Sequence, residues 1–287
     1  MPFKIAIASG KGGTGKTLLA TNLADYISQR EDTLLVDLDV EEPNDFIFIE
    51  GTQVNRVDQV KMIPSWDEGQ CTLCGLCSKI CKYHAVIQLG TFIAVFNELC
   101  HSCYACSELC PANALPMQAF KMGETRTMSK GRLTFIESRL EIGEEQAVPL
   151  IRKTHIMVDE RFHDIPFQIF DCPPGTSCPV AAATRHADLV ILVTEPTPFG
   201  LNDLKLAVET MQDLGKPVGV VINRDGIGNS EVEDFCKREQ LPVLAKIPFD
   251  REIARRYSKG ELVYTEVNSV ISALDQIMKF VQNHFNP

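Results

Sequence analysis

The chain begins with FKIAIASGKGGTGKT (residues 3–17), in which a short apolar segment runs directly into a glycine-rich loop. Residues 3–9 have the length and composition of a buried β-strand. The loop matches the pattern G-x-x-x-x-G-K-[ST] through Gly10, Gly15, Lys16 and Thr17. Apolar residues then recur at helical spacing at Leu18, Leu19, Leu23, Tyr26 and Ile27. A strand, such a loop and a helix in this order predict a phosphate-binding loop within an α/β domain.

Each part of this loop has a chemical task. Glycines let successive backbone N–H groups curl around a phosphate, and the helix that starts there adds its positive dipole end. We expect Lys16 to reach the β and γ phosphates and the Thr17 hydroxyl to hold Mg²⁺. The predicted nucleotide-binding residues of the loop are Gly10, Lys11, Gly12, Gly13, Thr14, Gly15, Lys16 and Thr17.

The rest of the chain alternates short apolar segments with amphipathic ones. This alternation predicts an α/β fold, with a parallel sheet covered by helices on both faces. The expected strands are residues 33–39, 166–171, 187–194, 217–223 and 241–247, and the expected helices are residues 200–214, 229–239 and 266–284. The alternation breaks between Lys61 and Pro116, where the sequence is rich in cysteine and poor in helix signals. We therefore predict one domain of residues 1–60 and 117–287, interrupted by an inserted domain of residues 61–116.

Eight of the eleven cysteines lie in two runs of identical spacing, CTLCGLCSKIC (71–81) and CHSCYACSELC (100–110). Two C-x₂-C-x₂-C-x₃-C runs are typical of a bacterial ferredoxin with two 4Fe-4S clusters, in which the fourth cysteine of each run binds the other cluster. The predicted ligands of one cluster are Cys71, Cys74, Cys77 and Cys110, and those of the other are Cys81, Cys100, Cys103 and Cys106.

Other interpretations of the cysteine runs remain open. Zinc sites usually draw cysteines in pairs around one ion, whereas three ligands within seven residues favour a larger cube. A purely structural role for the clusters is also possible, because a segment of about 55 residues has too small a core to fold strongly without a bound metal. Two complete ligand sets favour electron transfer, since one cube would suffice to stabilise the segment.

Composition excludes several classes of partner. The net charge of −10 argues against general nucleic-acid binding. The N-terminal apolar stretch is too short for a signal peptide, and no apolar run approaches the roughly 18 residues that span a bilayer. The predicted C-terminal helix carries a single lysine and no arginine, so we expect it to pack against the sheet without stable membrane association. We expect a cytoplasmic protein, in which cysteine clusters bind metal.

The second lysine of the loop, Lys11, makes GKGGTGKT resemble the deviant Walker A motif of the superfamily of MinD, ParA and the nitrogenase iron protein. The resemblance implies a P-loop ATPase that sandwiches ATP in a dimer, with Lys11 crossing to the partner's nucleotide. The dimer would be a homodimer or a heterodimer with a paralogue. VDLDVEEPN (residues 36–44) resembles the switch I segment, which implies that Asp39 orients the attacking water and that Asp37 supports the magnesium site.

The resemblance extends to later segments. FDCPPG (residues 170–175) resembles the Walker B and switch II region, so Asp171 is expected to hold Mg²⁺. Asn223 and Pro248 resemble base-binding positions that favour adenine, and the guanine motif N-K-x-D is absent. Cys178 lies where the nitrogenase iron protein has a cysteine that shares a cluster between subunits, but the second ligand of that cluster has no counterpart. Buried or redox-sensing thiols are the alternative for Cys172 and Cys178.

Three functions fit these patterns. The first is an ATPase that couples nucleotide-dependent dimer rearrangement to electron transfer, or to iron–sulfur or metal-cofactor maturation, on a partner protein. The second is a MinD- or ParA-type spatial positioner with redox-sensing or structural clusters. The third is an amide-forming enzyme like the cobyrinic acid a,c-diamide synthases, whose glutaminase domain this chain cannot accommodate. We favour the first, in which Lys11, Lys16 and Asp39 are the catalytic residues.

Overall fold

Strand β1 (Phe3–Ala8) lies inside a nine-stranded sheet with the order β11-β10-β9-β1-β8-β2-β7-β6-β3. The structure is a computed structural model that describes residues 2–285. In β1, Ile5 and Ile7 pack into one large apolar cluster, while the alternate residues Ala6 and Ala8 are also fully buried. Burial on both faces is the pattern of a parallel strand covered by helices on each side.

Seven adjacent strands of this sheet run parallel to one another. Besides β1 they are β2 (Thr33–Asp37), β7 (Leu133–Leu140), β8 (Phe167–Asp171), β9 (Leu189–Thr194), β10 (Val218–Asp225) and β11 (Val243–Pro248). Every strand that the sequence predicted from apolar runs is present, with ends that differ by at most two residues. The prediction of an α/β fold is confirmed for this part of the chain.

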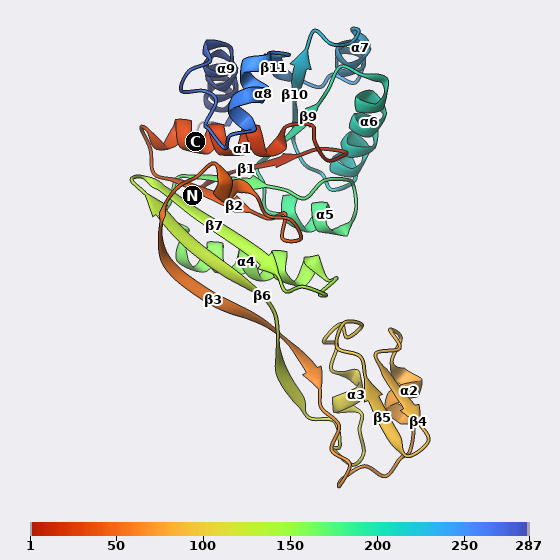
Figure 1. The fold of residues 1–287 in the computed structure, drawn as a ribbon. Helices are drawn as coiled ribbons and strands as arrows, with labels where there is room; N and C mark the ends of the chain where they lie inside the picture. The colour runs from red at the N-terminus through yellow and green to blue at the C-terminus, as the bar shows by residue number, and fades with distance from the viewer. Residues whose placement is uncertain (1, 286–287) are drawn as a thin grey trace. The chain divides into compact units, whose positions relative to one another are not determined.

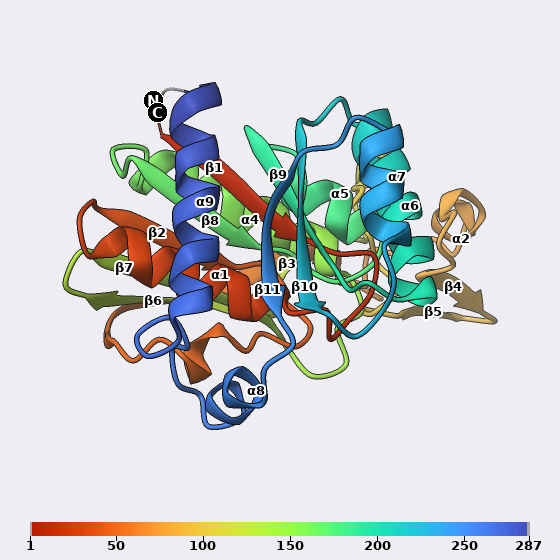
Figure 2. The same cartoon turned by 90° about the horizontal axis from the view of Figure 1, so that it is seen from above.

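Helices cover both faces of the sheet (Figures 1 and 2). Helices α1 (Lys16–Ser28) and α9 (Asn268–Phe285) share an apolar cluster with Ile5, Ile7 and Ile169 of the sheet. Helix α4 (Ala147–Arg161) reaches the opposite face, where His155 contacts Phe170. The remaining helices of this part are α5 (Cys178–Thr184), α6 (Pro198–Asp213), α7 (Glu231–Arg238) and α8 (Arg251–Tyr257), with the short turn η1 (Asp45–Ile47) after β2.

Two long strands at one edge correct the expectation of a parallel sheet. Strand β6 (Met117–Lys130) neighbours β7 and is joined to it by only Gly131 and Arg132, and β3 (Thr52–Pro64) forms the edge. A two-residue connection joins antiparallel strands, and the φ of +59° at Gly131 suits such a turn. The sheet is therefore mostly parallel, with an antiparallel hairpin added to it.

The chain divides into two compact units, one of residues 1–56, 125–139 and 147–287 and the other of residues 57–124 and 140–146. The second unit contains helices α2 (Leu76–Ile80) and α3 (Ala105–Glu108) and the antiparallel pair β4 (Val86–Leu89) and β5 (Phe92–Val95). The domain boundaries predicted from sequence at 60/61 and 116/117 differ from this division. The first falls inside β3, and residues 140–146 join the second unit because their side chains bond to it.

Helix α9 packs by one face, as its sequence pattern predicts. Val270, Leu274, Ile277 and Val281 are fully buried, while the polar residues between them are mostly exposed. No helix within residues 2–285 is both long enough and apolar enough to cross a membrane.

Helices α4 and α5 meet at a buried histidine. The Nε2 atom of His155 lies 3.1 Å from the carbonyl oxygen of Ala183, and the ring stands beside that of His186. Burial, with a smaller effect of His186, lowers the pKa of His155 to about 4. The folded protein therefore keeps this ring neutral at pH values at which the unfolded chain binds a proton.

This histidine predicts acid sensitivity of the fold. The contribution of His155 to the free energy of unfolding is about 3 kcal/mol. It is fully present above the unfolded pKa of about 6.5 and is lost as the pH falls towards 4. In urea unfolding between pH 7 and pH 4, His155→Gln should remove that part of the pH dependence. The exposed His163→Gln should keep the wild-type slope; parallel curves for all three proteins would contradict the assignment.

Candidate functional site

The phosphate-binding loop follows β1, and two glycines in it are required by close approach. Gly15 precedes α1 in the left-handed conformation, with a φ of +103°. A Cβ atom there would lie 2.2 Å from the side-chain nitrogen of Asn223. A Cβ atom on Gly10 would lie 2.3 Å from the backbone oxygen of Asp203 in α6. The loop is therefore wedged between neighbouring elements, and only glycine fits at these two positions.

Asn223, at the end of β10, holds this loop in place. Its Nδ2 atom donates a 2.7 Å hydrogen bond to the carbonyl oxygen of Thr14. Its Oδ1 atom accepts from the backbone N–H of Arg224, whose guanidinium group lies 2.6 Å from Glu195. The sequence predicted Asn223 as a base-binding residue; the structure places its amide against the phosphate loop, and the base-binding role stays a prediction.

Three acidic strand ends converge beside the loop, because the strands are parallel and in register. Asp171 pairs with Ile7 on one side and with Asp37 on the other. The hydroxyl of Thr17 donates a 2.7 Å hydrogen bond to Asp171 Oδ2. A hydroxyl and a carboxylate beside a phosphate loop are donors that suit Mg²⁺, which these two residues could hold between them and the phosphates.

Both carboxylate oxygens of Asp37 accept hydrogen bonds from backbone N–H groups. Its Oδ1 accepts from the N–H of Asp39, and its Oδ2 accepts from the N–H groups of Asn44 and Asp45. This buried carboxylate closes the turn of residues 39–45 on itself. The structure thus gives Asp37 a role in shaping switch I, and its predicted support of magnesium stays a prediction.

Asp39 lines the cavity at this edge and has a perturbed pKa. Burial raises its pKa to about 6, with Lys16 opposing the shift and the nearby Asp171 adding to it. At pH 7 the group is ionised but close to its titration range, which suits a residue that accepts a hydrogen bond from water. Sequence reasoning missed the fully buried Asp45, which lies against Asp171; nothing in its local pattern marks it as buried.

A cavity of about 440 Å³ opens over the loop. Lys16, Thr17, Asp39 and Pro248 line it, as do Gly12, Gly13, Gly15 and Asn223. The sequence assigned no individual role to the other lining residues Leu18, Glu42, Asn44, Pro174, Arg224, Phe249, Asp250, Ile253, Ala254 and Tyr257. Tyr257 stacks on Phe48 at 4.7 Å and forms an aromatic wall. The cavity therefore combines charged residues of the phosphate loop and switch I with apolar residues of α8.

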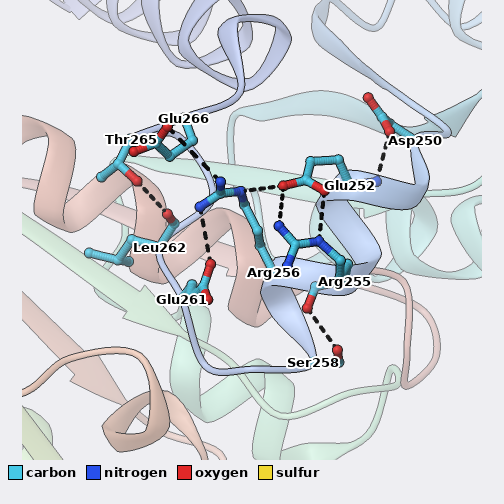
Figure 3. A network of polar contacts seen from close by, with 9 residues as sticks. All are labelled: Asp250, Glu252, Arg255, Arg256, Ser258, Glu261, Leu262, Thr265 and Glu266. Carbon is cyan, nitrogen blue, oxygen red and sulfur yellow. Dashed lines mark hydrogen bonds and ion pairs between the residues drawn. The ribbon is translucent and has the colours of Figure 1, made fainter.

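A polar network holds α8 against the loop that follows it (Figure 3). Asp250 caps the helix by accepting from the N–H of Glu252 at 2.8 Å. Glu252 pairs with Arg255 and Arg256, and Arg256 also pairs with Glu261 at 3.0 Å. The charges of Arg255 and Arg256 are thus paired with carboxylates of the helix and of its following loop.

Lys11 stands apart from this cavity. Its side chain is 36% exposed, and its Nζ atom lies 3.9 Å from Glu195 Oε2, near the outer limit of an ion pair. An exposed and weakly held lysine is free to leave this contact at little cost. Its predicted reach to a partner's nucleotide stays a prediction.

The eight cysteines of the two runs gather in two cavities of the second unit. One cavity is lined by Cys71, Cys74, Cys77 and Cys110. The other is lined by Cys81, Cys100, Cys103 and Cys106. Each set thus combines three cysteines of one run with the fourth of the other, which is the grouping that the spacing predicts.

The two runs also share one backbone conformation. Positive φ angles recur at the third and fifth positions of each run and three residues after its end. They are found at Leu73, Gly75 and His84 and again at Ser102, Tyr104 and Asn113. The N–H groups of Ala85 and Ala114 each donate a 3.3 Å hydrogen bond to the sulfur of the fourth cysteine, Cys81 and Cys110. Such bonds stabilise thiolate sulfur, and the wrapped loops leave each sulfur facing its cavity.

Each cavity presents four cysteine side chains, which is the donor set that a four-iron cube uses. Within residues 2–285, no group of three or more His, Cys, Asp or Glu side chains is arranged to hold a single ion. In a four-iron cube each cysteine binds a different iron, so the sulfurs stand farther apart. Burial, aided by the neighbouring cysteines, raises the pKa of Cys106 to about 11, and a bound cation would favour loss of the proton from this thiol.

The other cysteines lie elsewhere. Cys172 is fully buried after β8, and burial raises its pKa well above the usual range. Cys178 is exposed at the start of α5, and Cys236 is fully buried in α7. The bridging cluster considered for Cys178 stays a hypothesis.

Comparison with known proteins agrees with this geometry. Residues 5–263 match the CobQ/CobB/MinD/ParA nucleotide binding domain. The chain belongs to this family.

Relatives extend the comparison. An uncharacterized protein of Methanocaldococcus jannaschii is 30% identical over 94% of this chain and 95% of its own length. An iron–sulfur cluster carrier protein of Aquifex aeolicus is 25% identical over 90% of this chain and 60% of its own length. The septum site-determining protein MinD of Pyrococcus horikoshii, solved with Mg-ADP, shares the fold at a TM-score of 0.62 and 18% identity, covering 100% of this chain and 98% of that protein.

Gly15→Ala should weaken nucleotide binding in this member of the family. The new methyl group would collide with Asn223, and the φ of +103° disfavours any side chain, so the loop must move. We expect Mg-ADP affinity to fall by at least about tenfold in calorimetric titration, which corresponds to a loss of about 1.4 kcal/mol. Gly69→Ala, at a glycine without a close contact or a positive φ, is the matched control. Equal affinities of the two variants would contradict this reading of the loop.

Proposed function

We propose that this protein is an ATP-hydrolysing iron–sulfur protein that couples nucleotide-dependent dimer rearrangement to electron transfer, or to metal-cofactor maturation, on a partner. The observation that carries the proposal is the presence, in one chain of this nucleotide-binding family, of two cavities each lined by four cysteines. The relatives named iron–sulfur cluster carrier proteins support a link to iron–sulfur chemistry.

On the nucleotide side, Lys16 and the loop N–H groups bind the phosphates, while Thr17 and Asp171 hold Mg²⁺. Mg²⁺, when bound, neutralises the charge that develops on the phosphates. Asp39 aligns a water whose oxygen attacks the γ phosphorus as the bond to the bridging oxygen breaks. Lys11 of a second copy, or of a paralogue, adds positive charge to the same site. The protein is therefore a dimer when it binds ATP.

On the cysteine side, residues 61–116 form a ferredoxin-like domain that holds two 4Fe-4S clusters. The clusters, when bound, accept and release single electrons. The chain's own residues set where this occurs. Cys81 and Cys106 of one set pack in the same apolar cluster as Cys71 and Cys77 of the other. This shared packing supports electron exchange between the two centres within one unit.

Coupling follows from the connections between the two chemistries. The chain leaves switch I through η1 and β3 and enters the cysteine-rich unit. It returns through β6 and β7, and residues 140–146 then lead into α4 and β8, which ends at Asp171. Arg139, at the end of β7, donates to the carbonyl oxygen of Pro43 in switch I and covers the ring of Phe46 in η1. Release of the γ phosphate frees the switch segments, and both are tied to these connections.

Lys16→Ala should remove ATP hydrolysis without affecting the iron–sulfur sites. The variant loses the charge that holds the phosphates, so we expect ATP turnover to fall by more than about 100-fold, whereas the iron content and the EPR signal of the anaerobically purified protein should stay unchanged. The wild type should carry about eight iron atoms per chain.

The matched pair Cys106→Ser and Cys236→Ser makes the converse test, since both cysteines are buried. Cys106→Ser should lose about half of the iron, and Cys236→Ser should lose none. Wild-type protein that purifies without iron, or that binds DNA or lipid vesicles in an ATP-dependent way, would overturn the proposal in favour of a spatial positioner.

A further inference from the structure

A buried ion pair lies in the cysteine-rich unit. Lys61 of β3 and Glu144, between β7 and α4, approach to 2.6 Å, and each side chain is only 4% exposed. The other lysine of this unit with carboxylate partners, Lys121, is 39% exposed and meets Asp58 and Glu141 at the surface. Removing two charges from water costs free energy, so a buried ion pair need not stabilise the fold and can have another role.

Lys61 and Glu144 lie beside only one of the two cysteine cavities. Ile63, two residues along β3 from Lys61, packs in an apolar cluster with Cys100 and Cys81. Gln146, two residues after Glu144, donates to the carbonyl oxygen of Cys100 at 3.2 Å. The hydroxyl of Ser102 donates to the carbonyl oxygen of Met62 at 2.7 Å. The segments that carry the ion pair are therefore fastened to the Cys100 loop.

The charge of Lys61 reaches the cysteine itself. Burial raises the pKa of Cys100, and the ammonium group of Lys61 opposes that shift. The residues that line the other cavity, by contrast, include no charged side chain. Since the two cysteine runs share one backbone conformation, this ammonium group is a difference between otherwise similar sites.

We propose that the Lys61–Glu144 ion pair raises the reduction potential of the centre held by Cys81, Cys100, Cys103 and Cys106 above that of the other centre. The inference rests on the proposed function, since it requires both centres to be present. A positive charge in an apolar surrounding stabilises the reduced, more negative state of a neighbouring centre, and Glu144 offsets part of this effect. With both clusters bound, this difference would favour transfer of one electron from the Cys71 centre, which would be oxidised, to the Cys81 centre, which would be reduced, with no proton transferred.

The test is an EPR-monitored redox titration of the anaerobic, iron-loaded full-length protein. Lys61→Met removes the positive charge and should lower the potential of the Cys81 centre. Glu144→Gln removes the negative charge and should raise it. Lys61→Met/Glu144→Gln removes both and should return it towards the wild-type value. The Cys71 centre should stay nearly constant in all three, and Lys121→Met is the exposed control that should move neither centre.

Opposite shifts distinguish a charge effect from a packing effect, because damage to packing would move both single variants in the same direction. Shifts of the same sign, equal shifts in both centres, or no shift would overturn the inference. If a single variant loses the centre, the exchange Lys61→Glu/Glu144→Lys keeps a neutral pair and should lower the potential; an unchanged value would overturn the inference. Wild-type protein with fewer than two centres would instead overturn the proposed function.

Discussion

The register of three parallel strands is the constraint on which the nucleotide site depends. Strand β8 lies between β1 and β2, and Asp171 is aligned with both Ile7 and Asp37. This alignment brings the phosphate loop after β1, the turn after β2 and the carboxylate at the end of β8 to one edge of the sheet. The hydrogen bond from Thr17 to Asp171 then ties the first turn of α1 to that edge. A shift of one residue in β8 would turn Asp171 to the other face of the sheet.

The chain also leaves this edge of the sheet to enter the cysteine-rich unit. Switch I is closed on Asp37 by three backbone N–H groups and leads into β3, while Arg139 fastens the end of β7 to switch I. Residues 140–146 continue from this arginine and place Glu144 and Gln146 among the residues around Cys100. Only six residues thus separate Arg139, which contacts switch I, from Gln146, which contacts a cysteine site. This short path gives the proposed coupling a physical basis.

Much of this arrangement was predictable from the sequence. Apolar runs predicted the buried parallel strands, and the glycines with Lys16 predicted the phosphate loop. The spacing of the cysteines predicted how they are grouped. The long strands β3 and β6 did not show the alternation of apolar and polar residues that marks a half-buried strand. The first half of β3 is largely exposed, and the buried middle of β6 is a continuous run, residues 122–125, that includes the polar Glu124 and Thr125. The burial of Lys61, Glu144 and Asp45 depends on contacts between distant segments, and no local pattern encodes such contacts.

The central claim is that the nucleotide bound at the phosphate loop changes the properties of the two cysteine sites. The most direct measurement is the reduction potential of each centre, determined by EPR in wild-type protein without nucleotide, with Mg-ADP and with a non-hydrolysable Mg-ATP analogue. The account predicts that at least one centre changes its potential between the ADP and ATP-analogue states. Identical potentials in all three states, in protein shown to bind both nucleotides, would contradict it.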